Sequence, residues 1–141
     1  MYVFGNGGSA ALANHIASDL IRRPPIRVRS LCSNPALLTA LANDLGYERV
    51  FAEQLRALLV KGDVVLAISA SGRSKNVLRG LTFARRHGAT CLGLTGKGGK
   101  AMAELCHRVV SVDSADVHAV ENGHLIFMHA VIRILRKMVH P

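Results

Sequence analysis

The fold of this chain is decided by residues 63–77, which read Asp-Val-Val-Leu-Ala-Ile-Ser-Ala-Ser-Gly-Arg-Ser-Lys-Asn-Val. Residues 64–68 are a short apolar run with β-branched side chains, the pattern of a strand buried on both faces. Farther along, apolar side chains recur at helical spacing at Val77, Leu78, Leu81 and Ala84. The segment therefore predicts a buried strand, a tight turn and a helix with Ser74 at its N-cap.

The turn carries three hydroxyl groups, from Ser69, Ser71 and Ser74, close to Gly72. Free backbone N–H groups and the helix dipole favour negative charge at a helix N-terminus, and the hydroxyls add neutral donors. An ordinary Ser/Gly turn with a capping serine is the simpler interpretation. Because Ser-x-Ser-Gly-x-Ser supplies more donors than a turn needs, we expect a phosphate site here.

A second turn, Gly5-Asn6-Gly7-Gly8-Ser9, follows a strand expected at residues 1–4. Its glycines permit positive φ and a close approach of the backbone to a ligand. Ser9 is expected to cap a helix that runs to about Arg23 and is stopped by Pro24-Pro25. The turn is not GxGxxG, and no acidic residue clearly follows at the expected place, so no nucleotide cofactor is expected.

Short apolar runs alternate with helical patterns along the rest of the chain. We expect further strands at residues 27–31, 89–94 and 109–112, and further helices at residues 36–42, 48–59 and 117–139. This alternation implies right-handed crossovers and an α/β fold with a parallel sheet covered on both faces. A five-stranded sheet in the flavodoxin-like order 2-1-3-4-5 would place both turns at the carboxyl ends of neighbouring strands, where open sheets bind ligands.

Composition limits the function classes. The 141 residues suit one domain, and neither an apolar run of membrane-spanning length nor a signal peptide is evident, so a soluble cytoplasmic protein is expected. The three cysteines lack CxxC spacing, so a redox or zinc role for them is not expected. The net charge of +9 comes with only two tyrosines and four phenylalanines, too few for a base-stacking platform. Steering of a phosphorylated small molecule is therefore favoured over nucleic-acid binding, with a merely solvated surface as the alternative.

Residues 68–74 resemble the phosphosugar-binding loop of the sugar isomerase (SIS) domain family, and residues 5–9 resemble its other characteristic turn. Together with Asn43-Asp44-Leu45-Gly46-Tyr47, these motifs are similar to the phosphoheptose isomerase branch of that family. The resemblance covers residues 1–141. The helical segment that normally precedes the family's first strand has no counterpart among these residues. It implies interconversion of sedoheptulose 7-phosphate and D-glycero-D-manno-heptose 7-phosphate through an enediol.

The resemblance also implies sugar contacts. Residues matching the family's substrate-binding positions are Asn6, Gly7, Ser9, Asp44, Ser69, Ser71, Ser74 and Glu121. From the residues alone, Asp44 is equally an Asx-type turn former.

The helix expected at residues 117–139 carries further candidate groups. At 100° per residue, His118, Glu121 and His129 fall within about an 80° arc, whereas His124 lies outside it and is expected to pack in the structure. The family's equivalent helix carries Gln-Glu-x-His-x-x-x-x-His, so His129 matches its catalytic histidine and Glu121 stands in place of its glutamine. Asp19, four residues after His15, stands in place of the catalytic glutamate. The resemblance thus implies Asp19 and His129 as the acid–base pair.

A divalent metal ion is a second expectation for these residues. His15, Asp19, Glu121 and His129 offer two imidazoles and two carboxylates, and some family members hold zinc at the four corresponding positions. Aspartate is one methylene shorter than glutamate, so the carboxylate of Asp19 lies farther from the substrate. A misplacement of about 1 Å can cost on the order of 100-fold in rate. Either the pocket closes to compensate or activity is reduced.

Two consequences of the resemblance concern assembly and the alternative function. The family forms homotetramers with active sites between subunits, so a homo-oligomer is expected. The alternative function is a non-catalytic SIS protein that binds a sugar phosphate as a sensor or adaptor. The retained His15 and His129 argue against that alternative, whereas the shortened Asp19 and the positive charge favour it.

Overall fold

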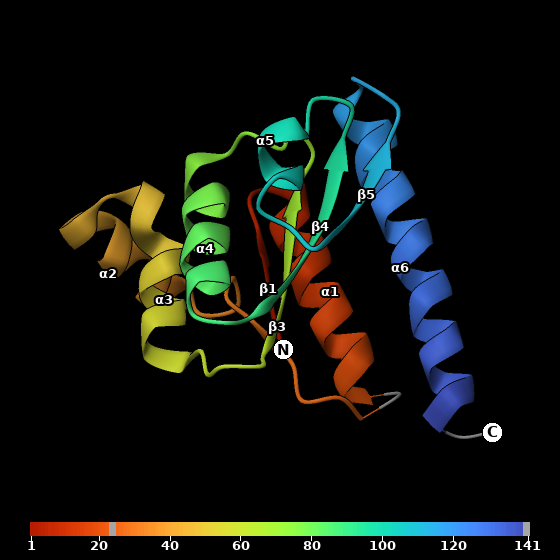
Figure 1. The fold of residues 1–141 in the computed structure, drawn as a ribbon, viewed down its shortest axis with the longest axis horizontal. Helices are drawn as coiled ribbons and strands as arrows, with labels where there is room; N and C mark the ends of the chain where they lie inside the picture. The colour runs from red at the N-terminus through yellow and green to blue at the C-terminus, as the bar shows by residue number, and fades with distance from the viewer. Residues whose placement is uncertain (23–24, 140–141) are drawn as a thin grey trace.

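The computed structural model describes residues 1–22 and 25–139. Five parallel strands form one sheet in the order β2-β1-β3-β4-β5 (Figure 1). The strands are β1 (Tyr2–Gly5), β2 (Arg29–Ser30), β3 (Val64–Ser69), β4 (Thr90–Gly96) and β5 (Arg108–Val112). The predicted α/β class and the flavodoxin-like strand order are confirmed.

Helices cover both faces of this sheet. They are α1 (Gly8–Arg22), α2 (Pro35–Leu45), the 3-10 turn η1 (Tyr47–Arg49), α3 (Val50–Leu58), α4 (Lys75–Arg86), α5 (Lys100–Ala103) and α6 (Val117–Val139). Figure 1 shows α1 and α6 on one side of the sheet and α2, α3 and α4 on the other. In the described part of the chain, none of the helices combines the length and the apolar character needed to cross a bilayer.

Two apolar clusters bind these layers to the sheet. On the α3–α4 side, the rings of Phe4 and Phe51 stack with centroids 4.7 Å apart. On the α1–α6 side, Val3 packs with Ile16 and Met128. Val3 and Phe4 are consecutive residues of β1 and are fully buried on opposite faces, as the alternation of a strand requires. Both faces of the central strands are therefore buried, which is why the sequence of β3 is an unbroken apolar run.

Several predicted boundaries were wrong. Strand β2 contains only residues 29–30 because it is an edge strand that pairs with β1 alone. Helix α1 starts at Gly8, so Ser9 is not its cap but lies buried in its first turn. The end of α1 lies at Arg22, and the predicted stop near Arg23 and Pro24 falls outside the described residues.

The segment between β2 and α3 also differs. Helix α2 continues through Asn43 and Asp44, which we expected to break it, and ends where Gly46 adopts a φ of +86°. A glycine tolerates this conformation, and its N–H still bonds to the carbonyl of Ala42. The helix predicted at residues 48–59 is divided into η1 and α3.

Candidate active site

The two turns lie side by side at the carboxyl end of the sheet. Gly5 and Ile68 are paired in the β1–β3 ladder, so the residues that follow them leave the sheet together. A Cβ atom on Gly5 would lie 2.6 Å from the Ile68 carbonyl oxygen, so only glycine fits at this crossing. Gly7 has a φ of +55°, which is the conformation expected of a glycine in a tight turn.

The serine turn brings its three hydroxyl groups together. Ser69 Oγ lies 3.2 Å from Ser74 Oγ and 3.5 Å from Ser71 Oγ, and it accepts a hydrogen bond from the Gly72 N–H at 3.1 Å. Ser74 occupies the N-cap position of α4, but its side chain makes no capping hydrogen bond. Because the first N–H groups of a helix have no intrahelical acceptor, the turn offers both hydroxyl and amide donors to an anion.

A pair of asparagines joins the two turns. Asn6 Nδ2 donates to Asn76 Oδ1 at 2.9 Å, and Asn76 Nδ2 donates to Asn6 Oδ1 at 2.8 Å. The Tyr47 hydroxyl donates to the same Asn6 oxygen at 2.9 Å. Asn76 and Tyr47 were not among the site residues predicted from the sequence. The signal in the sequence was an amide two residues after Ser74, in the first turn of the helix that follows the serine turn. The structure buries Asn76, which is 3% exposed.

Asp44 and Ser9 are less clearly placed. Asp44 is exposed, and its Oδ1 accepts a hydrogen bond from the side chain of Asn43 at 2.9 Å. Of the 43–47 motif, it is Tyr47 that reaches the glycine turn. Ser9 is 4% exposed, and its Cβ lies against Gly5, beneath the turn. Sugar contacts by Asp44 and Ser9 remain predictions.

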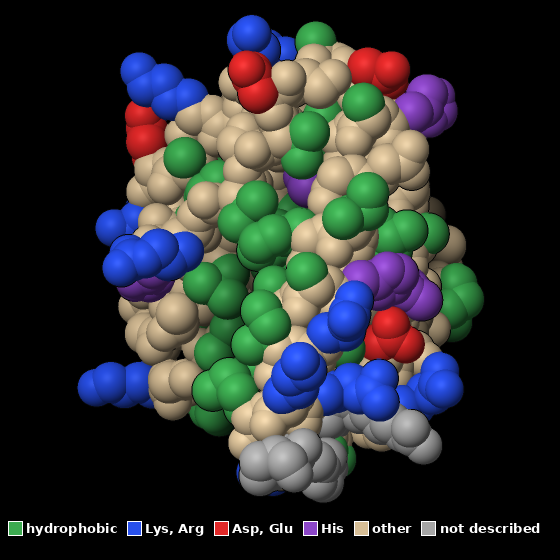
Figure 2. Space-filling model, turned by 90° about the vertical axis from the view of Figure 1, so that its right-hand side faces the viewer, with side chains coloured by type: hydrophobic (Ala, Val, Ile, Leu, Met, Phe, Trp, Pro, Cys, Tyr) green, Lys and Arg blue, Asp and Glu red, His purple; other side chains and the backbone are tan. Residues whose placement is uncertain are grey.

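Helices α1 and α6 bring three of the predicted residues together. His15 Nε2 and His129 Nε2 lie 2.9 Å apart, and Asp19 Oδ2 lies 3.4 Å from the first and 3.9 Å from the second. The histidine side chains are about half exposed (48% and 47%), and the Asp19 side chain is 25% exposed. Figure 2 faces α6 and shows histidine side chains gathered at the surface beside a carboxylate, with Lys and Arg side chains nearby. Arg22 Nη1 lies 3.9 Å from Asp19 Oδ1.

Glu121 lies apart from this cluster. Its carboxylate occupies the space that a side chain on Gly8 would fill, at the N-terminus of α1. With His15 and Leu125 it lines a groove of about 390 Å³ between α1 and α6. The structure therefore groups His15, Asp19 and His129 as possible ligands, and it places Glu121 in the adjoining groove.

The three grouped residues fit a zinc ion. Ligand atoms about 2.0–2.1 Å from a tetrahedral zinc lie roughly 3.4 Å from one another. The separations here, 2.9, 3.4 and 3.9 Å, bracket that value. Two imidazoles and one carboxylate, with a fourth position left open, form the type of set found in catalytic zinc sites.

His124 packs in the interior, as predicted. It is fully buried, and its Nε2 donates to the carbonyl oxygen of Thr95 at 2.9 Å. Burial lowers the pKa of the His124 imidazole, and the Thr95 carbonyl and the charge of Glu121 oppose that shift. His124 is therefore a neutral core residue rather than a ligand.

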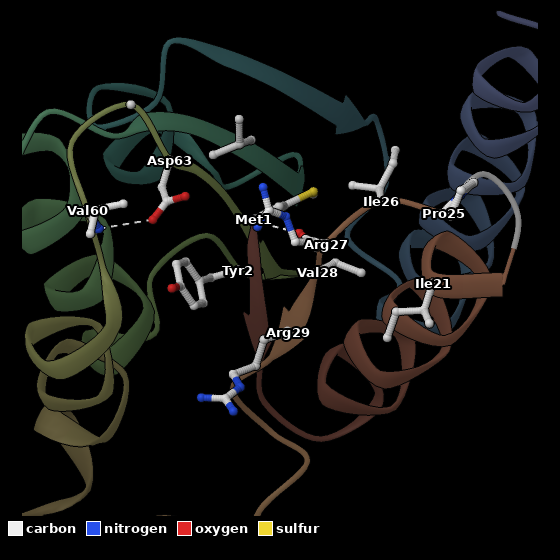
Figure 3. Close-up of a pocket in the computed structure, with 12 residues that line it drawn as sticks. Met1, Tyr2, Ile21, Pro25, Ile26, Arg27, Val28, Arg29, Val60 and Asp63 are labelled. Atoms are coloured by element: carbon white, nitrogen blue, oxygen red, sulfur yellow. Dashed lines mark hydrogen bonds between the residues drawn. The ribbon is translucent and has the colours of Figure 1, made fainter. Parts of the chain in front are cut away.

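A larger cavity, about 950 Å³, lies at the opposite end of the sheet (Figure 3). It is lined by the start of β1 and β3 and by the segment around Arg27 and Arg29, and among the described lining residues Asp63 contributes a carboxylate. Parallel sheets bind their ligands at the carboxyl ends of the strands, where both turns and their hydroxyl donors lie. We therefore place the candidate site at the smaller groove and the turns, although the other cavity is larger.

Comparison with known proteins identifies the family of this chain. A family model described as the SIS domain matches residues 1–96. The phosphoheptose isomerase of Burkholderia pseudomallei is 41% identical over 140 residues, which cover 96% of this chain and 71% of that protein. The phosphoheptose isomerase of Aquifex aeolicus is 39% identical over 142 residues, with 97% and 74% covered. The solved phosphoheptose isomerase of Neisseria gonorrhoeae superposes with a TM-score of 0.92 at 31% identity, over 96% of this chain and 75% of that one. The chain therefore belongs to the SIS domain family and, within it, to the phosphoheptose isomerases.

Proposed function

We propose that this chain interconverts sedoheptulose 7-phosphate and D-glycero-D-manno-heptose 7-phosphate through an enediol, with Asp19 and His129 as the acid–base pair. The observation that carries the proposal is the convergence of Asp19 and His129 from two different helices, beside His15. Membership of the phosphoheptose isomerase family supports the substrate class.

The serine turn would hold the phosphate group. The hydroxyl oxygens of Ser71 and Ser74 both lie within 3.5 Å of Ser69 Oγ. The N-terminus of α4 adds amide donors. Along α1, His15 lies seven positions after Gly8, a rise of about 10 Å, so the ligand must be extended to reach both ends of the site. An anchored phosphate fixes the orientation of the distant reactive carbons, which lowers the entropic part of the barrier.

The proton transfers would occur at the histidine cluster. In the aldose-to-ketose direction, the Asp19 carboxylate takes the proton from C2 while His129 gives a proton to the oxygen on C1, which forms the enediol. The hydroxyl on C2 then loses its proton and C1 gains one, so the two carbons exchange oxidation state without any external oxidant. The 2.9 Å contact between His15 and His129 orients the second imidazole for this role.

We also propose that the same three residues, His15, Asp19 and His129, can instead hold zinc, with Glu121 able to join from the groove; in that state Asp19 Oδ2 and His129 Nε2 are ligands. When bound, the ion would act as a Lewis acid that polarises the substrate carbonyl. Metal analysis of protein purified without added zinc should find about one equivalent, and His15→Ala should lower that content several-fold. Less than a tenth of an equivalent in the unaltered chain would refute zinc binding.

A second copy of the chain is the proposed partner of the α6 surface. Ile126, Ile134 and Met138 are 70%, 59% and 73% exposed on α6, and Figure 2 shows further hydrophobic side chains across this face. The half-exposed histidines beside them would gain the water exclusion that enediol chemistry requires if a second subunit covered them. We propose a tetramer with sites at the subunit interfaces, and sedimentation velocity tests it: Ile134→Lys should reduce the mass, and a monomeric unaltered chain would refute it.

The central experiment incubates the purified chain with sedoheptulose 7-phosphate, with and without zinc, and follows aldose formation by NMR. We expect turnover that His129→Ala abolishes, whereas His118→Ala, an exposed histidine on the same helix, retains it. Absence of turnover, with sugar phosphate binding that is lost in Ser71→Ala, would refute the isomerase and support a sugar phosphate sensor. Failure to bind would remove both functions.

A further inference from the structure

His124 is a buried polar residue that the proposed reaction does not use. It lies on α6, three residues after Glu121 and five before His129, and none of its side chain reaches solvent. Burial of a polar side chain costs free energy unless hydrogen bonds compensate, so an aliphatic residue would be the simpler occupant of this position. The position of its one hydrogen bond indicates why a histidine is there.

The imidazole ties α6 to the end of β4. Its Nε2 donates to the Thr95 carbonyl oxygen at 2.9 Å, and among the described residues its Nδ1 has no hydrogen-bond partner. A carbonyl oxygen only accepts, so the proton must be on Nε2, and Nδ1 carries a lone pair. The bond therefore has one direction and one tautomer, and it holds α6 at one register along β4.

Thr95 also contacts the serine turn. Its Oγ1 lies in the space that a side chain on Gly72 or Gly99 would occupy, and Thr95 is 1% exposed. In the sheet, Thr95 is paired with Ser69, the first residue of the turn. One residue of β4 thus touches the phosphate-binding turn through its side chain and α6 through its carbonyl group.

Two further contacts between the first half of α6 and the sheet are apolar. The Val120 side chain lies against Gly96, and Gly123 lies against Val112. Such contacts resist separation of the helix from the sheet but restrain sliding less than a directed hydrogen bond does. At 1.5 Å per residue, His129 lies about 7.5 Å along the helix axis from His124 and Glu121 about 4.5 Å in the other direction. A slide of α6 would move both together relative to the serine turn.

We propose that His124 is a positioning residue: its hydrogen bond to the Thr95 carbonyl fixes the distance from the serine turn to His129 and Glu121. The inference rests on the proposed function, because the distance matters only if one ligand spans both ends of the site. In this role the His124–Thr95 hydrogen bond sets the geometry of the proposed site as well as stabilising the fold.

The test compares His124→Leu, which keeps an apolar filling and removes the donor, with His124→Gln. The Gln amide nitrogen is the same number of bonds from Cβ as the imidazole Nε2, so it can donate to the same carbonyl. Leu81→Ala, in the cluster on the other face of the sheet, controls for lost stability. Rates are referred to the folded fraction at a temperature well below each melting point.

We expect His124→Leu to lower kcat by about 10–100-fold, since misplacement of about 1 Å has that effect, with KM changed by less than about threefold. His124→Gln should recover kcat to within about fivefold, and Leu81→Ala should leave the kcat of the folded fraction unchanged. Nitrogen NMR of the unaltered chain should find His124 protonated on Nε2.

Two results would overturn this role alone: an unchanged kcat in His124→Leu, or a proton on Nδ1 in an active unaltered chain. If His124→Leu does not fold, the kcat of His124→Gln and the tautomer of His124 in the unaltered chain decide. A proton on Nδ1 would exclude the hydrogen bond to Thr95 even if His124→Gln were active. An unaltered chain without turnover would refute the proposed function, and this role with it.

Discussion

The two turns each contain a glycine with positive φ, and the structure predicts very different costs for replacing them by alanine. Gly7 has a φ of +55° and nothing within 4 Å of an added Cβ atom. Gly72 has a φ of +62°, but its added Cβ would overlap Gly99 Cα and lie 2.6 Å from Thr95 Oγ1. Both variants strain the backbone, and only Gly72→Ala also creates a clash with backbone that cannot rotate away.

The magnitudes follow from these two effects. A non-glycine residue in the left-handed region costs about 1–2 kcal/mol, which both variants share. Overpacking in a filled region costs about 1–3 kcal/mol more, which applies to Gly72→Ala alone. For a chain of this length, 1 kcal/mol corresponds to about 3–4 °C in Tm. We therefore expect Gly7→Ala to lose about 3–8 °C, and Gly72→Ala to lose a further 3–12 °C.

The assay is differential scanning calorimetry of both variants and the unaltered chain at one pH and protein concentration, with urea unfolding as a second measurement. Equal melting temperatures for the two variants would refute the reasoning, because the shared backbone strain would then account for everything. A larger loss in Gly7→Ala would show that the space around these turns differs from the one described.

Three further predictions concern the site and the core. Asp19→Glu should raise kcat several-fold in the isomerase assay, because the longer side chain brings the carboxylate nearer to the substrate carbons; an unchanged or lower kcat would show that the pocket has adapted to aspartate. The free energy of unfolding should fall between pH 7 and pH 5, because the pKa of buried His124 is lowered and the unfolded chain, with an ordinary histidine pKa of about 6.5, binds more protons. Urea titrations at several pH values measure that slope, and a slope that stays the same in His124→Gln would mean that another group causes it. Tyr47→Phe should weaken sugar phosphate binding by about 2–10-fold, since it removes one hydrogen bond that holds Asn6, and calorimetric titration with no change in Kd would contradict that role.

The fold was predictable because its signals are local. The apolar run at residues 64–68 became β3, and the helical pattern of residues 117–139 became α6 with the predicted limits. The alternation of such segments, together with the handedness of crossovers, leaves few sheet orders. The wrong predictions were also local in origin. Strand β2 has little apolar character to define its length. Ser9 was predicted to cap α1, but the helix already begins at Gly8, so Ser9 lies inside it.

The site was predictable only in part. His15 and Asp19 are four residues apart on one helix, and that spacing alone predicts their contact. Helical angles suggested that Glu121 and His129 share a face, but an angle gives no position along the axis, and the two residues are eight positions apart. The Asn6–Asn76 pair joins residues 70 positions apart, and amides have no periodic pattern that marks such a partner.

The arrangement of the two helical layers has a consequence for how this protein can change. The serine turn leads into α4, whose layer packs with Phe4 and Phe51, whereas His15, Asp19 and His129 belong to α1 and α6 on the opposite face of the sheet. The proposed phosphate site and the proposed proton-transfer residues thus belong to helical layers on opposite faces of the five-stranded sheet. Substitutions in the α1–α6 layer can abolish or alter the proposed reaction while the proposed phosphate site in the serine turn stays unchanged. We therefore expect that few substitutions would separate an isomerase from a non-catalytic binder of the same sugar phosphate on this scaffold.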